Sequence, residues 1–463
     1  MSYRPKEITI AGAGLVGSLL SVLLGQRGYQ VDVFEHRADM RRQEVDSGRS
    51  INLALSERGI YALKKAGLME VVEPLLIPMR GRMLHFEDGE QEFSPYGQRP
   101  DEFIYSVSRS ELNSLMMTAA ERHPDVNVHF EQKCEGVDFE SNQLEVFSPQ
   151  SKSRRKVRFE MLIGADGAGS KVRQALIAVA KGESRSEFLD HDYKELVIPA
   201  NEDGTHKIEK EALHIWPRGG FMLIALPNLD GSFTVTLFLP RTGETSFASL
   251  DSEGCLETFF DQYFSDAREL IPELNGDFFS NPTGRLGTVR CHPWFYQNDS
   301  LIIGDASHAI VPFHGQGMNS GFEDCSELMR LLDKHEDDWE VVLPEFNRIR
   351  KPCADAIADM ALENYITMRD SVRDLKFQLK KEIGFELESR FPDRFIPRYS
   401  MVMFHRIPYD EVFQRGIVQE RILSQLTEGV EMIGEVDFDL AERLVEEELK
   451  SLAHQICPPT ATR

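Results

Sequence analysis

The pattern of hydrophobic and polar positions changes twice along the chain. Residues 7–35 start with a short apolar strand, pass through a glycine-rich turn into an apolar helix, and end in a second strand. Between residues 190 and 240, four short apolar or alternating runs separated by turn signals predict a mostly antiparallel sheet. From about residue 317 onward the pattern is mainly helical, and Pro352 within it predicts a kink or a break.

The turn after the first strand has the glycine spacing of a dinucleotide-binding unit. Gly12 allows the tight turn, Gly14 lets the backbone approach a pyrophosphate, and Gly17 lets the helix pack closely on the strand. Glu35, at the end of the second strand, would accept a hydrogen bond from a ribose hydroxyl. The motif leaves open whether the dinucleotide carries nicotinamide or flavin.

Two later junctions repeat the same design. The runs 161–173 and 300–305 each end a strand at an acid, Asp166 or Asp305, beside small residues. Acids at strand ends suit a hydroxyl-rich ligand that lies across the carboxyl edge of a sheet. The stretch GQGMN, with Gly315 and Gly317, opens a helix whose amides and partial positive charge would face a ring system. FAD is long enough to touch all three junctions, with Asp305 on its ribityl chain.

A helix that starts near residue 108 supplies another candidate contact. Ser108, with Glu111 three positions on, forms a capping-box pattern. Arg109 in the first turn is unfavourable beside the positive end of the helix dipole unless an anion such as a pyrophosphate lies nearby. Cys134, after the next strand, is either at the edge of the cofactor or a core thiol. The basic stretch 148–159 between two strand-like runs predicts a solvated hairpin.

Composition narrows the classes of protein that are possible. The chain has 463 residues, enough for two joined domains, and no apolar run approaches the roughly 18 to 20 residues that span a bilayer. Without a signal or transit segment, a cytoplasmic protein is expected. The six cysteines form no CxxC pair and do not cluster with histidine, so neither a metal site nor a disulfide framework is predicted. A net charge of -24 argues against nucleic-acid and membrane partners.

Three motifs together resemble a known family. GAGLVG (12–17), GADGAGSKVR (164–173) and GDASHAIVPFHGQGMN (304–319), in this order, are similar to the single-component FAD-dependent aromatic hydroxylases of the p-hydroxybenzoate hydroxylase type. Further stretches resemble the branch of this family that hydroxylates kynurenine: 49–59, 79–85, 95–97, 213–219, 232–238, 361–365 and 394–402. The resemblance covers nearly everything from residue 6 to about residue 420.

This resemblance implies an α/β fold with a Rossmann-like FAD-binding domain, an inserted and mostly antiparallel β-sheet substrate domain, and a helical C-terminal region. The FAD-binding domain would comprise residues 1–180 and 286–335, the sheet domain residues 181–285, and the helical region residues 336–463. Residues 420–463 are charged and amphipathic, where eukaryotic members of the family carry an apolar membrane segment.

The resemblance also implies the reaction. NADPH would reduce bound FAD, and dioxygen would then form a flavin hydroperoxide that hydroxylates the ring of L-kynurenine beside its amino group. The product would be 3-hydroxykynurenine, in tryptophan degradation. NADPH has no binding domain of its own in such families, which fits the single complete GxGxxG. A homodimer is possible.

Site residues carry over position by position. The carboxylate and amino groups of kynurenine would be bound by a guanidinium, two phenols and an amide, namely Arg82, Tyr96, Tyr399 and Asn364. The walls of the ring pocket would be Leu213, Ile224, Phe238, Pro312 and Phe313. The remaining cofactor contacts would be Leu15, Glu35, His36, Arg37, Ala54, Arg109, Asp305, Met318 and Asn319. His314 is the candidate catalytic residue, with a lining role favoured over proton transfer.

Several alternatives stay open on the sequence. A flavin hydroxylase of another ring, such as a phenolic acid or a quinone precursor, would be expected to show a clear base. A non-catalytic FAD-binding interaction protein that senses redox state would leave the Arg82 group without a joint purpose. A nicotinamide dehydrogenase would leave Asp166 and Asp305 unexplained, and a flavin halogenase is disfavoured because the chain has no WxWxI stretch.

Overall fold

The computed structural model describes residues 3–42, 52–371 and 374–452, so the start of the 49–59 motif and the end of the C-terminal segment lie outside the described residues. The chain divides into two compact units, each made of three segments. The first unit comprises Met1–Leu76, Val107–Leu189 and Leu286–Ala358. The second comprises Ile77–Ser106, Asp190–Arg285 and Asp359–Arg463.

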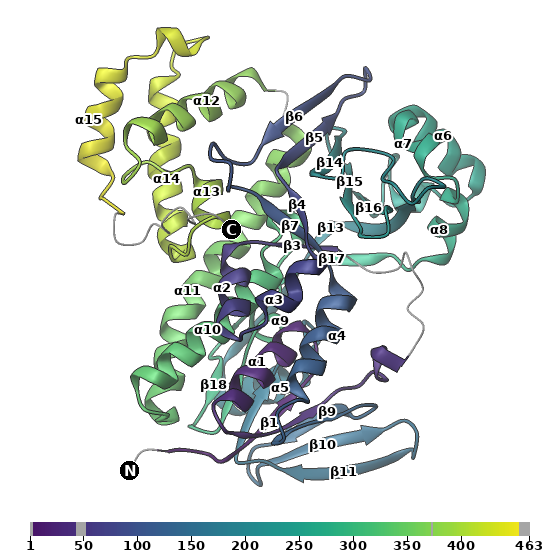
Figure 1. Cartoon of the computed structure of the whole chain (residues 1–463), viewed down its shortest axis with the longest axis vertical. Coiled ribbons are helices and arrows are strands. Elements are labelled where there is room, and N and C mark those ends of the chain that lie inside the picture. Colours follow the sequence, from purple (N-terminus) through teal and green to yellow (C-terminus); the bar gives the residue numbers. More distant parts are fainter. Residues whose placement is uncertain (1–2, 43–51, 372–373, 453–463) are drawn as a thin grey trace. The chain divides into compact units, whose positions relative to one another are not determined.

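The first unit is built on a six-stranded sheet (Figure 1). The strand order is β18-β19-β12-β1-β2-β8, parallel from β19 to β8, with β18 antiparallel at one edge. The bounds are β1 Glu7–Ala11, β2 Gln30–Phe34, β8 Val126–His129, β12 Met161–Gly164, β18 Phe295–Tyr296 and β19 Ser300–Ile302. The predicted strand, glycine turn, helix and second strand are therefore confirmed as β1, α1 (Leu15–Gln26) and β2.

Helices and a small sheet complete this unit. The principal helices are α2 Glu57–Lys65, α4 Arg109–Ala120, α5 Lys171–Ala180 and α10 Gly317–Lys334. The helix start at Ser108 is confirmed, because its side chain accepts a hydrogen bond from the Glu111 amide at the N-terminus of α4. A three-stranded antiparallel sheet contains β9 Lys133–Asp138, β10 Gln143–Ser148 and β11 Ser153–Arg158. Strands β10 and β11 form the predicted basic hairpin, and β11 is almost fully exposed.

The second unit contains strands β13-β16-β15-β14-β5-β6 side by side in that order. Their bounds are β5 Gly81–His85, β6 Gln91–Pro95, β13 Glu183–Ile198, β14 Ala212–Pro217, β15 Met222–Pro227 and β16 Phe233–Pro240. The four runs predicted between residues 190 and 240 are confirmed, and neighbours among them are antiparallel. Strand β5 pairs parallel with β14, so residues far earlier in the chain extend this sheet.

One face of this sheet is the core of the second unit. Trp216, Leu223, Val235, Leu237 and Leu196 lie on that face and are buried in one cluster with helices α6 Glu253–Tyr263, α7 Ser265–Leu270 and α8 Leu274–Ser280. Because side chains alternate along a strand, the residues between these positions point to the opposite face. That opposite face carries four of the predicted substrate residues, Arg82, Leu213, Ile224 and Phe238.

The C-terminal part of the chain is helical, as predicted. The helices are α11 Trp339–Ile366, α12 Leu375–Arg390, α13 Arg398–Met403, α14 Tyr409–Leu426 and α15 Phe438–Glu448, and α12, α14 and α15 share an apolar cluster. Helix α11 runs through both Pro344 and Pro352 without a break. A proline removes one backbone donor, and the buried neighbours Cys353 and Ile357 hold the helix together at this point.

The division into units differs from the domain bounds expected from sequence. Residues 77–106 were expected in the FAD-binding domain, but Ile77–Ser106 belongs to the second unit because β5 and β6 join its sheet. Residues up to Ala358 belong to the first unit instead of separating at residue 336. Local patterns could not show either feature, because both depend on pairing between distant segments.

Candidate active site

The turn after β1 requires glycine at two positions because of its backbone conformation and close packing. Gly12 has φ +100, and a Cβ there would lie 2.5 Å from the Ala165 carbonyl oxygen. A Cβ on Gly17 would lie 2.0 Å from the Gly12 carbonyl oxygen, so α1 can approach the turn only with glycine at this position. Gly14 has φ -72, and no atom of the described residues lies within 4 Å of the position of a Cβ. The side of Gly14 that faces open space is therefore available to a ligand that lies against the backbone.

Glu35 stabilises this turn from the end of β2. Its carboxylate accepts hydrogen bonds from the amide of Ala13 at 2.8 Å and from the amide and Nε of Arg37 at 2.9 and 2.8 Å. Burial acts to raise the pKa of this carboxyl, but the Arg37 guanidinium and the two amides outweigh burial and lower it. Glu35 is thus an ionised acceptor, while the side chains of Arg37 and His36 are exposed. The ribose contact of Glu35 stays a prediction.

The other two strand-end junctions are tied together by one arginine. Asp166 caps α5 by accepting hydrogen bonds from the amides of Lys171 and Val172 at 2.7 and 3.3 Å, and burial raises the pKa of its carboxyl. Arg173 donates to the carbonyl oxygens of Ala168 and Ala306 at 2.6 and 2.8 Å. Ala306 follows Asp305, whose side chain is exposed at the start of a short helix, Asp305–His308.

The glycine-rich stretch 315–319 is locked in place by Asn319. The Asn319 amide donates to the carbonyl oxygens of Ala54 and Gly315, both at 2.8 Å, and accepts from the Ser56 amide at 2.9 Å. Gly315 has φ +62, which favours glycine, and a Cβ there would lie 3.0 Å from the Ala54 side chain. The structure thus brings together three residues predicted at the cofactor, but it gives Asn319 a structural task as well.

A buried network of charged side chains connects α10 to the third strand-end junction and to Arg350. Asp324 accepts hydrogen bonds from the Gly304 amide at 3.2 Å, from His308 at 2.5 Å and from Arg350 Nε at 2.7 Å. Glu323 pairs with Arg350 at 2.7 Å and with the buried Arg58. Because Gly304 precedes Asp305, this network fixes the third junction and the start of α10 together. Sequence reasoning missed it, since each charge alone fits an exposed helix face.

The remaining predicted cofactor residues lie in the same unit. Leu15 and Met318 are buried at the first turns of α1 and α10, and Arg109 is exposed at the first position of α4. Cys134 on β9 lies near Asp166, and burial, with the charge of Asp166, raises the pKa of its thiol to about 12. This thiol is therefore neutral at physiological pH. The contacts that these four side chains would make with FAD stay predictions.

The second unit brings three of the predicted substrate residues into one cluster. The rings of Tyr96 and Tyr399 are stacked with centroids 5.4 Å apart and planes at 14°. The Arg82 guanidinium carbon lies 4.8 Å from the centroid of the Tyr399 ring and 5.5 Å from that of the Tyr96 ring. Among the described residues, Arg82 Nε and Tyr96 Oη are buried without a hydrogen-bond partner. Burial raises the pKa of both phenols, so each keeps its proton.

Strand register places the apolar residues on the same sheet face as Arg82. Leu213 is the neighbour of Arg82 across β14 and β5, and Ile224 is the neighbour of Ile215, two residues after Leu213. Phe238 lies two residues after Thr236, the neighbour of Ile224. Since paired residues share a face and side chains alternate, Arg82, Leu213, Ile224 and Phe238 all point away from the core cluster.

Asn364 and three first-unit residues complete the predicted set. Asn364 lies near the end of α11, and its amide donates to Met368 Sδ at 3.3 Å in the π-helical turn Thr367–Ser371 that packs on β14. Pro312, Phe313 and His314 form a single turn before Gly315, with Phe313 and His314 buried. Contacts of these four residues with a ligand stay a prediction.

A lysine absent from the prediction lies at the Arg82 cluster. Lys381 on α12 donates from Nζ to Ser94 Oγ at 2.6 Å, and Ser94 is the cross-strand neighbour of Arg82. Burial, and next the charge of Arg82, lower the pKa of Lys381 to about 8, while Glu92 acts in the opposite direction. The sequence around residue 381 is polar and helical, with two adjacent lysines, and carries no signal that singles this one out.

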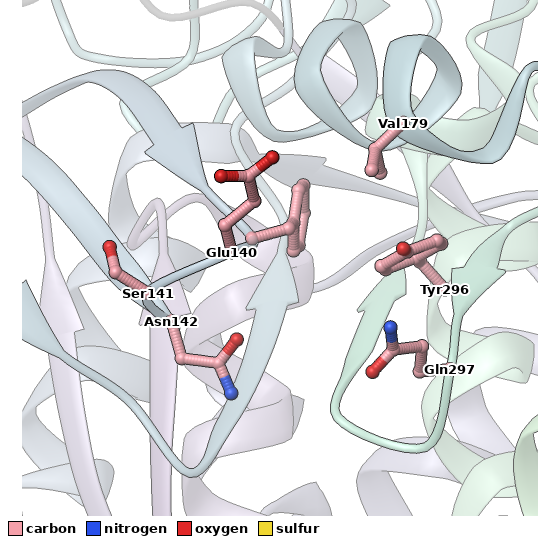
Figure 2. Close-up of a pocket in the computed structure, with 7 residues that line it drawn as sticks. Glu140, Ser141, Asn142, Val179, Tyr296 and Gln297 are labelled. Atoms are coloured by element: carbon pink, nitrogen blue, oxygen red, sulfur yellow. The ribbon is translucent and has the colours of Figure 1, made fainter.

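A separate pocket of about 560 Å³ lies in the first unit (Figure 2). It is lined by Phe139, Glu140, Ser141, Asn142, Val179, Tyr296 and Gln297. Figure 2 shows Tyr296 and Gln297 facing the turn that carries Glu140 to Asn142. None of the predicted site residues belongs to this pocket.

Comparison with known proteins defines the class first. Residues 6–361 match the family described as the FAD binding domain, and the chain belongs to this family. A solved structure of 2-methyl-3-hydroxypyridine-5-carboxylic acid oxygenase matches 80% of this chain and 94% of its own, with a TM-score of 0.64 at 16% identity, which shows a shared fold. The protein is an FAD-dependent aromatic monooxygenase in class, as the three motifs predicted.

The particular family follows from closer relatives. Kynurenine 3-monooxygenase of Myxococcus xanthus is 48% identical over 446 residues, covering 96% of both chains. Kynurenine 3-monooxygenase of Stenotrophomonas maltophilia is 44% identical over 98% of this chain and 99% of that protein. This chain belongs to the kynurenine 3-monooxygenase family. In the described part of the chain, no helix is both long and apolar enough to cross a membrane.

The first unit fits the cofactor that this family carries. Described atoms pack closely against Gly12 and Gly17, but none lies near the Cβ position of Gly14. This leaves room for a pyrophosphate at the N-terminus of α1. The acids at 35, 166 and 305 end three strands of one sheet, and one oxygen of the buried Asp166 has no partner among the described residues. The residues present therefore fit FAD.

Proposed function

We propose that this protein hydroxylates the ring of L-kynurenine beside its amino group and so forms 3-hydroxykynurenine. NADPH and dioxygen are the co-substrates. The relatives named above support this proposal by their identity over nearly the whole chain. The single structural observation that carries it is the Arg82 cluster, a guanidinium with two neutral phenols on a sheet face that also presents apolar side chains.

The cluster suits the amino-acid end of the substrate. Buried polar groups in folded proteins nearly always have hydrogen-bond partners, so the orphaned Arg82 Nε and Tyr96 Oη call for an acceptor from outside the described chain. A carboxylate is the acceptor that a guanidinium binds best, because two parallel N–H donors match its two oxygens. Tyr399, together with the Asn364 amide, would bind the lone pairs of the carboxylate that Arg82 leaves free and the amino group.

The apolar residues suit the aromatic end. Leu213, Ile224 and Phe238 share the sheet face of Arg82, so an aromatic ring can lie on them while its carboxylate lies at Arg82. A place for Pro312 and Phe313 in the ring pocket stays a prediction from the family resemblance. Exclusion of water by these side chains would strengthen the polar contacts at the other end of the substrate.

When bound, FAD supplies the redox chemistry by accepting electrons from NADPH and activating dioxygen. The chain would hold it at the glycine turn, at the three strand-end acids, and through Leu15, Glu35, His36, Arg37, Ala54, Arg109, Cys134, Met318 and Asn319. The start of α10, held by the Asp324 network, presents backbone amides and the positive end of a helix dipole beside Gly315 and Gly317. A flavin ring held there would have the negative charge of its reduced form stabilised by that field.

The part of the chain that the structure describes supplies no base of obvious strength for this reaction, and the substrate does not require one. An aromatic amine already donates electrons to its own ring, so positioning and dehydration can suffice. His314 is buried in the turn before Gly315, and we assign it a lining role ahead of proton transfer. A cytoplasmic location, expected from the sequence, completes the proposal.

The proposal is tested by a substrate panel. The purified protein, with its FAD content measured, is incubated with NADPH and either L-kynurenine or a phenolic acid, and products are analysed by liquid chromatography and mass spectrometry. We expect a product one oxygen atom heavier than kynurenine that co-elutes with 3-hydroxykynurenine. Hydroxylation of the phenolic acid alone would contradict the substrate, and bound FAD without turnover of either compound would favour a redox-sensing protein.

A further inference from the structure

A second cation lies beside Arg82 on the substrate side of the sheet. Lys381 Nζ donates to Ser94 Oγ at 2.6 Å, and Ser94 stands directly opposite Arg82 across β6 and β5. Cross-strand neighbours of this kind have Cβ atoms roughly 5 Å apart and share a face. The Lys381 ammonium is therefore held against the strand pair that carries Arg82, by a helix from the C-terminal segment.

The two cations lack a matching anion among the described residues. No described carboxylate pairs with Arg82 or Lys381 within 4 Å, and the one acid that acts on Lys381 from β6, Glu92, is exposed. The other groups around Lys381 are the Ser94 hydroxyl, the Arg82 guanidinium and, on its own helix, the Phe385 ring at 5.6 Å. Two poorly hydrated like charges repel each other, and an anion between them would offset that repulsion.

We propose that Lys381 is a second carboxylate-binding residue, which contacts the substrate carboxylate together with Arg82 and thereby selects substrates that carry an anionic side chain on the ring. This inference rests on the proposed function and deepens it. The ammonium has three donors, of which Ser94 uses one, so Nζ can bind a carboxylate oxygen without leaving Ser94. Arg82 would still bind both oxygens through its fork, since each oxygen can accept two hydrogen bonds, and Tyr96 and Tyr399 would flank it.

The test compares two ligands in the FAD-loaded enzyme. Dissociation constants for L-kynurenine and for its decarboxylated analogue are measured from the change in flavin absorbance, in wild type, Lys381→Met and Lys381→Arg. We expect Lys381→Met to weaken kynurenine binding by about tenfold or more, as for one charged hydrogen bond lost, and to leave the analogue within about twofold. Lys381→Arg should keep kynurenine binding. The matched control is Lys380→Met, which removes the neighbouring lysine that pairs with Glu420.

A pH series gives a second readout that a structural role would not change. Because the pKa of Lys381 is about 8, the kynurenine affinity of the wild type should fall as pH rises through this value. Lys381→Arg stays charged and should lack this transition. The substrate's own amino group titrates equally in both experiments, so the difference between the two profiles isolates the lysine. This comparison holds even where Lys381→Met fails to fold.

Either of two results would overturn the inference: equal loss of both ligands in Lys381→Met, or superimposable pH profiles of wild type and Lys381→Arg. Failure of the proposed function is distinguishable, because the wild type would then bind or turn over no kynurenine in the same preparation. A wild type that hydroxylates kynurenine, with a Lys381→Met variant of equal kynurenine affinity, would contradict only the role of Lys381.

Discussion

The ligand-binding role that we propose for Arg82 rests on its surroundings in the structure. In the sequence it is one of several arginines near a strand, and a surface salt bridge would be the preferred interpretation without the family resemblance. In the structure its guanidinium lies over two phenol rings, and no described acid pairs with it. Arg80, two residues earlier, is exposed and pairs with Glu211 at 2.7 Å. The two arginines thus form a natural pair for comparison.

Arg82→Ala should bind FAD normally but bind L-kynurenine about 2 kcal/mol more weakly, roughly 30-fold, because one charged hydrogen-bonding partner is lost. Arg80→Ala should change neither affinity beyond about 0.5 kcal/mol, since an exposed ion pair contributes little. Equilibrium titration of the flavin spectrum measures both. Equal behaviour of the two variants would remove Arg82 from the site.

A buried histidine pair predicts how stability depends on pH. His214 Nδ1 lies 2.8 Å from His85 Nε2, and its Nε2 lies 2.7 Å from the Glu209 carbonyl oxygen. Burial lowers the pKa of His214 from 6.5 to about 4. The folded state therefore binds fewer protons than the unfolded state in this window, so the free energy of unfolding should fall as pH drops from 6.5 to 4, by up to about 3 kcal/mol.

Denaturant unfolding at a series of pH values, in wild type and His214→Phe, checks this prediction. Groups outside the His85–His214 pair titrate alike in both proteins, so the difference between the two curves belongs to this pair. The variant should lose less stability than the wild type over this pH range. Parallel curves would show that His214 does not resist protonation in the fold.

At the scale of elements, the glycines of the turn between β1 and α1 have different roles, one in packing and one in cofactor binding. Gly17 is required by close packing, because a Cβ would overlap the Gly12 carbonyl oxygen. Gly14 has a backbone conformation open to alanine and no atom near its Cβ position. Its glycine is explained only by a ligand that approaches the backbone.

Gly14→Ala should keep the stability of the FAD-free protein within about 0.5 kcal/mol of wild type, while weakening FAD binding by about tenfold or more. Gly17→Ala should destabilise the FAD-free protein itself, because the added methyl group has no space. Thermal unfolding of the stripped proteins and FAD titration measure the two effects. A Gly14→Ala variant with unchanged FAD affinity would contradict a cofactor at this turn.

The elements themselves were largely predictable, for local reasons. Short-range patterns of neighbouring residues predict the glycine turn between β1 and α1, the cap at Ser108 and the four strands between residues 190 and 240. Pro352 misled in part, since α11 continues through it where buried neighbours stabilise the helix. Lys381 and the Asp324 network were missed, because their meaning depends on partners distant in sequence.

At the scale of the whole molecule, the chain builds two units from alternating segments, and each unit collects one part of the predicted site. The first unit holds the glycine turns and strand-end acids, and the second holds the Arg82 cluster and its apolar neighbours. The segment 77–106 carries Arg82 and Tyr96 into the second unit through β5 and β6. No local pattern in that segment predicts its pairing with β14, so the grouping of Arg82 with the apolar residues of the second unit could be predicted only through the family resemblance.

The central claim is that this chain transfers one oxygen atom from dioxygen to the ring of an aromatic amino acid. The most direct measurement is the reaction of the FAD-loaded protein with NADPH and L-kynurenine under dioxygen labelled with heavy oxygen, with mass spectrometry of the product. We predict 3-hydroxykynurenine that carries a single labelled oxygen on its ring, formed in nearly equal amount to the NADPH consumed. NADPH consumption that yields only peroxide, or a product whose new oxygen is unlabelled, would contradict the account.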